Sequence, residues 1–189
     1  MTEVSSLTGR LLVATPALAD PNFDRAVVLL LDHDEEGSLG VVLNRPTPVD
    51  VGDILEGWGE LAGEPGVVFQ GGPVSLDSAL GVAVIPGDSL EAAPLGWRRV
   101  HGAIGLVDLE APPELLAAAL GSLRIFAGYS GWGPGQLEDE LTEGAWYVVE
   151  SEPGDVSATR PEGLWRAVLR RQRSELAMVA TYPDDPSLN

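Results

Sequence analysis

The segment that most suggests chemistry is residues 128–132, Gly-Tyr-Ser-Gly-Trp, in which a serine lies between glycines. A serine on a sharp turn between a strand and a helix is the arrangement of a nucleophile elbow. That motif requires a glycine two residues after the serine, and Trp132 occupies this position. A catalytic triad also requires a base, and the chain contains only His33 and His101. We therefore expect Ser130 to be a small turn residue and not a nucleophile.

The same glycine-rich segment, extended to residues 128–135, is also a candidate phosphate loop, because free N–H groups at the start of a helix attract anions. Walker loops place Lys and Ser or Thr after their glycines, whereas Gln136 and Leu137 follow here. Acidic residues at 138–140 would fill the first turn of the next helix and complement its dipole. These features favour a structural loop over a phosphate site.

In a structural loop, closely spaced glycines allow large neighbours to approach the backbone. We expect Trp132 to be largely buried and to anchor the loop against the end of the preceding strand. Gly131 and Gly133 should then not tolerate a larger side chain.

Metal sites are not indicated by the acidic and histidine residues. Residues 32–37, Asp-His-Asp-Glu-Glu-Gly, resemble the start of a calcium loop, but position twelve is Leu43 instead of a bidentate glutamate. The chain has no cysteine, and His33 and His101 are far apart, so no zinc pattern is present. We expect a solvated hairpin tip at residues 32–38, and neither a metal nor another cofactor.

The Asn44, Arg45 and Pro46 tripeptide is a stronger candidate for recognition. An arginine at the end of a buried strand and just before a proline is held in one direction, and it can bind a carboxylate through two hydrogen bonds. One interpretation is an internal ion pair with one of the twenty-nine acidic residues. The other is a site for an anion or a peptide, shared with the segment from Gly128 to Gln136.

The elements that position these residues follow from apolar patterns and turn residues. Residues 26–31 and 39–43 are continuous Val/Leu runs, which predict two arms of a hairpin covered on both faces and placed in the middle of a sheet. Further strands are predicted at 9–14, 67–70, 80–85, 98–100, 104–107, 124–127 and 146–150. Helices are predicted at 51–55, 114–120, 136–141 and 162–178, the last being the longest.

These strands outnumber the helices and do not alternate with them regularly, which predicts the α+β class and not a doubly wound sheet. The length of 189 residues and the lack of a long linker predict one domain over residues 1–189, with an extended tail from about residue 179.

Charge and hydropathy indicate the compartment and the class of partner. The formal net charge is −18 and all eleven basic residues are arginine, so direct binding to nucleic acid is not expected. The one arginine cluster is at residues 166, 170, 171 and 173. An apolar run at residues 11–14 is too short for a signal peptide, and no stretch is long enough to span a membrane. We expect a cytoplasmic protein that does not contact membranes.

Four segments share a specific order and spacing: Gly-Arg-Leu-Leu at 9–12 with Asp-Pro-Asn-Phe at 20–23, Gly-Val-Val-Leu-Asn-Arg-Pro at 40–46, Gly-Gly-Pro-Val at 71–74, and Gly-Tyr-Ser-Gly-Trp-Gly-Pro-Gly-Gln-Leu-Glu at 128–138. With these segments the chain resembles the AlgH/YqgE family of bacterial proteins, over roughly residues 8 to 172. The resemblance implies a compact α+β fold with a branched, mixed or antiparallel sheet around which helices pack. It implies no settled activity, although the family is sometimes labelled a transcriptional regulator.

The absence of complete catalytic motifs and the acidic composition favour a non-enzymatic regulatory or adaptor protein that binds another protein. Exposed tryptophans among Trp58, Trp97, Trp132 and Trp165 would be anchors of such an interface. Two alternatives are a binder of small molecules or anions, or an enzyme, at the same regions, and a transcriptional regulator, which net charge disfavours as a direct DNA binder. The candidate binding residues are Asn44, Arg45, Pro46, Gly72, Tyr129, Trp132, Gly133 and Gln136.

Overall fold

The computed structural model describes residues 6–18, 20–21, 23–86, 95–172 and 176–181. Its strands are β1 Leu11–Ala14, β2 Val27–Asp34, β3 Gly37–Val42, β4 Pro46–Asp50, β5 Val67–Gln70, β6 Val74–Val84, β7 Trp97–His101, β8 Ile104–Val107, β9 Ser122–Trp132 and β10 Trp146–Val149. Its helices are α1 Val51–Ile54, α2 Glu114–Ala117, α3 Gln136–Thr142, α4 Pro153–Val156, a 3-10 turn Pro161–Gly163, α5 Leu164–Arg170 and α6 Leu176–Val179.

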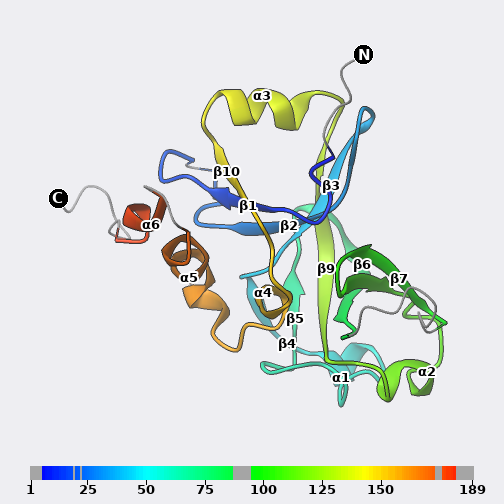
Figure 1. Cartoon of the computed structure of the whole chain (residues 1–189). Coiled ribbons are helices and arrows are strands. Elements are labelled where there is room, and N and C mark those ends of the chain that lie inside the picture. The colour runs from blue at the N-terminus through cyan, green and yellow to red at the C-terminus, as the bar shows by residue number, and fades with distance from the viewer. Residues whose placement is uncertain (1–5, 19, 22, 87–94, 173–175, 182–189) are drawn as a thin grey trace.

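The sheet is curled and branched. Its main path runs β10-β1-β2-β3-β9-β6-β8-β7, and β4 and β5 leave this path as a side branch (Figure 1). The branch arises at β9, whose residues Ser130–Trp132 pair with β3 while Phe126 and Ala127 pair with β5. Every pairing is antiparallel except that between β5 and β9. The expected α+β class with a branched sheet is confirmed.

The hairpin of β2 and β3 lies inside the sheet, as its apolar runs predict. β2 has β1 on one side and β3 on the other, and β3 continues the sheet to β9. Alternate β2 residues enter two apolar clusters: Val27 and Leu29 face α4 and α5, whereas Val28 and Leu30 face α3. Because both faces are covered, all four of these side chains are fully buried.

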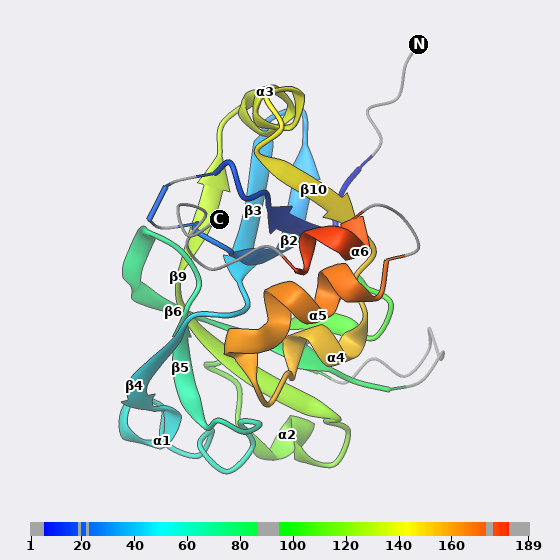
Figure 2. The same ribbon diagram turned by 90° about the vertical axis from the view of Figure 1, so that its left-hand side faces the viewer.

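Helices close the two faces of the sheet at different places. In Figure 2, α4, α5 and α6 lie together on one side, while α3 lies at one end of the molecule and α1 and α2 at the other. A third apolar cluster forms at the α1 and α2 end, with Trp58, Leu116 and Ile125 among its members.

The expected helix over residues 162–178 is wrong as a single element. α5 ends at Arg170 and α6 begins at Leu176, with residues 173–175 outside the described part. The guanidinium of Arg166 on α5 donates to the carbonyl of Ala180, directly after α6, so this contact holds the two helices against each other. Tertiary packing thus replaces one long helix by two short ones. The tail expected from about residue 179 is described only up to residue 181.

The expected glycine loop at 128–135 is also mostly wrong. β9 continues through Trp132, so residues 128–132 are strand and only 133–135 connect it to α3. Ser130 is therefore a buried strand residue and not a turn residue. The reason is the pairing of Ser130, Gly131 and Trp132 with β3, which supplies backbone partners from a distant part of the chain.

Candidate functional site

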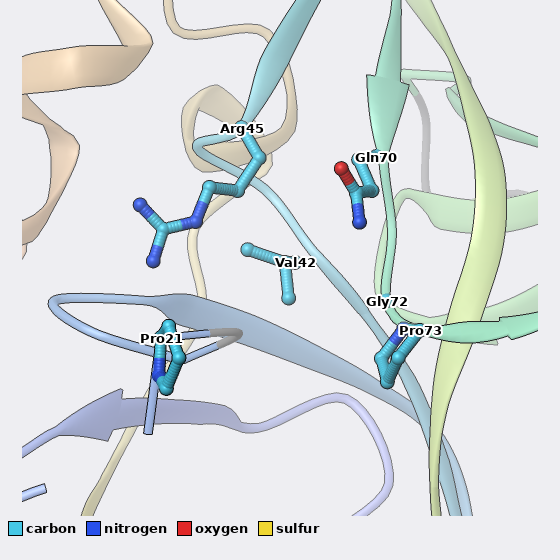
Figure 3. A pocket seen from close by; sticks show the side chains of 6 residues that line it. All are labelled: Pro21, Val42, Arg45, Gln70, Gly72 and Pro73. Atoms are coloured by element: carbon cyan, nitrogen blue, oxygen red, sulfur yellow. The ribbon is translucent and has the colours of Figure 1, made fainter. Parts of the chain in front are cut away.

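A pocket of about 330 Å³ opens where the end of β3, the connection from β5 to β6 and the turn at residues 20–21 meet. Its lining residues are Pro21, Val42, Arg45, Gln70, Gly72 and Pro73 (Figure 3). This volume is at the lower end of the range that holds small ligands, and it also fits one side chain of a partner protein.

Two consecutive glycines, Gly71 and the pocket-lining Gly72, lie between the pocket and β9. The carbonyl of Gly71 accepts from the N–H of Val42 at 2.9 Å, and the N–H of Gly71 donates to the carbonyl of Ala127 at 2.8 Å. The segment thus fills the space between β3 and β9. At Gly72, a Cβ would lie 2.3 Å from the carbonyl carbon of Tyr129, so only glycine fits between Pro73 and this strand.

Arg45 is held at the mouth of the pocket by the backbone around it. The side chain of the preceding Asn44 is buried, and its oxygen accepts from the N–H of Val27 at 3.0 Å while its nitrogen donates to the carbonyl of Arg25 at 2.9 Å. These bonds fix the end of β3, because both partners lie beside the start of β2. The guanidinium of Arg45 donates to the carbonyl of Asp24.

Of the two interpretations of Arg45, the internal ion pair is not found among the described residues. Among the described residues, no carboxylate lies within ion-pair distance of its guanidinium. One backbone carbonyl satisfies a single N–H group and contributes no opposite charge. The side chain is half-buried and keeps its charge facing the pocket.

Gln70 is the second polar side chain of the pocket, and sequence analysis missed it. The backbone N–H of Gln70 donates to the backbone carbonyl of Arg45 at 2.9 Å, so a hydrogen bond joins the main chains of the two residues. In Figure 3 the two side chains lie on opposite sides of Val42, with the Arg45 guanidinium on the side of Pro21. The Gln70 amide is exposed and has no hydrogen-bond partner in the described part of the chain. A polar residue that ends the apolar strand at 67–69, just before two glycines, was the available signal.

The candidate residues of the 128–136 segment do not join this pocket, apart from the contact of Tyr129 with Gly72. Trp132 is 6% exposed and packs against Phe23 and Trp146, with ring centroids 6.3 and 6.1 Å away. Its indole N–H donates to Glu140 Oε1 at 3.1 Å, and the indole of Trp146 donates to the same oxygen at 2.9 Å. The expected burial of Trp132 is confirmed, although its neighbours are α3 and β10 instead of the strand end at 124–127.

Gly133 and Gln136 complete this network around Glu140. The Gln136 side chain accepts from the N–H of Gly133 and donates to Glu140 Oε2, both at 3.0 Å. The polar atoms are thereby satisfied internally. Pro46, the last of the predicted residues, is exposed at the start of β4 and does not line the pocket. Of the eight candidates, Arg45 and Gly72 line the pocket, and Asn44 and Tyr129 support it.

The histidines and Ser130 do not assemble a nucleophile and its base. Ser130 is fully buried, and its hydroxyl donates to the carbonyl of Gly71 at 3.0 Å. His33 Nδ1 shares a 2.6 Å hydrogen bond with the hydroxyl of Ser38, at the far end of the β2–β3 hairpin. Within the described residues there is no group of three or more acidic or histidine side chains placed to hold a metal ion.

Arg124 is a buried cation that the sequence pattern did not reveal. Its guanidinium lies 4.3 Å from the ring centre of Phe69 and donates to the carbonyl of Glu64 at 2.9 Å. Burial lowers the pKa of Arg124 to about 10, so the group stays charged at neutral pH. It lies on the covered face of β9 and is not among the residues that line the pocket.

No helix in the described part of the chain combines the length and the apolar character needed to cross a bilayer.

Comparison with known proteins gives the family. The chain is 91% identical to a UPF0301 protein of Streptomyces avermitilis, over all of this chain and 98% of that protein. A crystal structure of a protein from Corynebacterium diphtheriae superimposes with a TM-score of 0.88 at 31% identity, covering 96% of this chain and 95% of that one. The solution structure of the AlgH protein from Pseudomonas aeruginosa gives a TM-score of 0.67 at 28% identity, covering 97% of each chain. The family model described as AlgH-like matches residues 11–177, most of the chain, and the protein therefore belongs to the AlgH-like family.

Proposed function

We propose that this protein is a non-enzymatic regulatory or adaptor protein of the cytoplasm, and that it acts by binding another protein at the pocket around Arg45. The observation that carries the proposal is a half-buried guanidinium that faces a pocket and has no ion-pair partner among the described residues. A charge held in this way is costly to bury unless a partner neutralises it, and arginine is enriched at the centres of protein interfaces.

The chemistry of the pocket supports binding over catalysis. Among the described residues that line it, Arg45 is the one titratable group, and a guanidinium stays protonated and cannot act as a general base. Ser130 is the serine whose neighbours resemble a nucleophile elbow. Its hydroxyl is buried and donates to the backbone carbonyl of Gly71.

The tryptophans do not provide the anchors of the interface. Trp58, Trp97, Trp132 and Trp165 are each at most 6% exposed, so none of them meets the condition of exposure that an anchor requires. This leaves the arginine, with the exposed residues around it, as the part of the surface suited to recognition.

The pocket volume favours a second candidate, a protein that binds a small anionic molecule at Arg45 and Gln70. The two candidates differ in what reaches the guanidinium: a side chain of a folded partner or a free ligand.

Affinity capture from a lysate of a bacterium that carries the gene, followed by mass spectrometry, tests the proposal. Three immobilised forms are compared: wild type, Arg45→Gln and Arg160→Gln. Arg160 is exposed and its side chain makes no hydrogen bond or ion pair with the other described residues, so its variant removes the same charge away from the pocket. We expect a protein that wild type and Arg160→Gln retain and Arg45→Gln loses. Equal retention by all three forms, or capture of a small molecule alone, contradicts a protein-binding role of this pocket.

A further inference from the structure

The rim of the pocket continues into an irregular part of β6. In the pairing with β9, Val74 lies opposite Tyr129 and Ala79 lies opposite Ala127, so residues 75–78 of β6 face the single residue Gly128. These residues are all exposed and bulge outward, beginning two residues after Pro73, which lines the pocket. Ser75 adopts a positive φ of 49°, a conformation that turns the chain out of the strand.

The bulge displays apolar side chains in a defined position. Leu76 is 53% exposed and Val74 is 37% exposed. A Cβ on Gly128 would lie 3.0 Å from Cδ2 of Leu76 and 2.9 Å from the carbonyl of Val74, so the bulge rests directly on the strand. Pro73, Val74 and Leu76 therefore form an apolar lip beside the pocket.

The polar side of the pocket matches one negative charge. Arg45 contributes a single guanidinium, whose N–H groups beyond the one bonded to Asp24 have no partner among the described residues. Gln70 adds a neutral amide donor on the neighbouring segment. One guanidinium and one amide suit a carboxylate, whereas a phosphate dianion would keep an unpaired charge. The net charge of −18 also opposes a partner with many acids, so a lone acidic residue among apolar ones is favoured.

Building on the function proposed above, we propose that the pocket and the apolar lip together bind a segment of a partner protein that carries one glutamate or aspartate flanked by apolar residues. The carboxylate accepts hydrogen bonds from Arg45 and Gln70. The flanking side chains cover Pro73, Val74 and Leu76 and remove their apolar surface from water.

Spectra of the ¹⁵N-labelled full chain with three probes test this assignment: a blocked pentapeptide with one glutamate between two leucines, its glutamine counterpart, and acetate. The reporters are the side-chain N–H resonances of Arg45 and Gln70. We expect the glutamate peptide to shift both resonances saturably, with an affinity roughly tenfold above that of the glutamine peptide, as the loss of a charged hydrogen-bond acceptor implies.

Variants separate the two parts of the site. Arg45→Gln and Gln70→Ala should each lower the affinity for the glutamate peptide. Gln70→Ala removes no hydrogen bond among the described residues, so it should not disturb the fold. Leu76→Ser should lower the affinity for the glutamate peptide roughly tenfold, because less apolar surface is buried, while the response to acetate stays unchanged. Arg160→Gln should behave as wild type.

Four results would overturn the inference: equal affinity for the two peptides, acetate saturating at the same concentration as the peptide, no effect of Leu76→Ser, or no shift at millimolar peptide. If the pentapeptides fail while capture of a partner still depends on Arg45, the adaptor function stands and only the chemistry of the partner segment is wrong. If the glutamate peptide binds but no partner is captured, the site is real and the adaptor function is wrong.

Discussion

At the scale of single residues, crowding by the backbone decides which glycines are required. Gly72 lies against the carbonyl of Tyr129, whereas the nearest atom to a Cβ on Gly131 is a ring carbon of Tyr129 at 3.7 Å, an ordinary contact. Gly131 also lacks a positive φ, as does Gly133. The expectation that Gly131 and Gly133 exclude side chains is therefore wrong. The position that requires glycine is Gly72, in another segment.

Gly72→Ala should lower the free energy of unfolding by at least about 3 kcal/mol, because a Cβ 2.3 Å from backbone atoms forces a main-chain shift. Gly131→Ala is the matched control and should change stability by no more than about 1 kcal/mol in either direction. Urea denaturation followed by tryptophan fluorescence measures both. Equal effects of the two substitutions would show that the close approach at Gly72 is not present in solution.

Trp132→Ala should cost about 3–5 kcal/mol, as expected for truncating a buried aromatic ring. The substitution removes the contacts with Phe23 and Trp146 and one hydrogen bond to Glu140. Trp132→Phe keeps most of the packing and should lose less. A thermal melt of Trp132→Ala that coincides with wild type would reject the structural role of this residue and point to a binding surface instead.

Arg124→Met should leave the free energy of unfolding unchanged or raise it by up to about 2 kcal/mol, because a buried cation without a carboxylate is replaced by an apolar chain of similar length. The lowered pKa of about 10 means that the unfolded chain holds this proton more tightly. Burial of the charged guanidinium therefore lowers the free energy of unfolding by a constant amount at pH values below about 10, and this loss becomes smaller only above that pH. The difference between variant and wild type should stay the same between about pH 5 and pH 8 in urea titrations. Arg124→Ala, which also removes packing on Phe69, should be less stable than Arg124→Met.

At the scale of elements, the β2–β3 hairpin contributes buried side chains to the apolar clusters on both faces of the sheet. Leu30 on β2 and Val41 on β3 are fully buried, on opposite faces of the hairpin. The side branch of β4 and β5 shows the contrast, because β4 pairs with β5 alone and is mostly exposed, with prolines at positions 46 and 48. Prolines are tolerated there because an edge strand needs fewer backbone donors.

Leu30→Asp should prevent folding, because an unpaired buried charge costs several kcal/mol of a total that is only about 5–15 kcal/mol. Asp32→Ala, at an exposed position of the same strand, is the control and should fold normally. Circular dichroism and the urea midpoint distinguish the two. Cooperative unfolding of Leu30→Asp at the wild-type midpoint would show that the hairpin does not lie in the centre of the sheet.

At the scale of the whole molecule, two of the described arginines in the predicted cluster at 166–173 make contacts within the protein. Arg171 contacts Asp155 and Glu152, and its hydrogen bond with Asp155 raises the pKa of its guanidinium. Arg166 donates to the carbonyl of Ala180 and lies over the ring of Trp165. Arg170 is exposed on the same helix. Within the described residues, the predicted arginine cluster is therefore engaged mostly inside the protein.

Direct binding to duplex DNA should be absent, since a net charge of −18 repels phosphates and Arg166 and Arg171, in the described part of the arginine cluster, make contacts within the protein. Gel retardation at physiological salt should show no shift below about 10 µM protein. Sub-micromolar retardation that weakens steeply with added salt would contradict this prediction. Loss of such binding in Arg170→Gln would then identify α5 as the contact.

The amino-acid sequence by itself determined the features that depend on near neighbours. Continuous Val/Leu runs predicted β2 and β3 and their coverage on both faces, which burial of Val27 and Val28 confirms. The order of Asn44, Arg45 and Pro46 predicted an arginine held at the end of a strand, and the structure places it in the short connection from β3 to β4, where its guanidinium donates to the carbonyl of Asp24. These predictions succeed because side-chain periodicity and proline geometry act within a few residues.

Only the tertiary structure decided what depends on distant segments. β9 extends past Ala127 because β3 supplies hydrogen bonds to Ser130–Trp132, and no local pattern contains that pairing. Gln70 joins the site because its N–H bonds to the carbonyl of Arg45, twenty-five positions earlier in the chain. The pocket itself exists because Gly71 and Gly72 fit between β3 and β9, where any Cβ would collide with the backbone. Backbone groups must find partners wherever the fold offers them, and such pairing is a property of the assembled sheet.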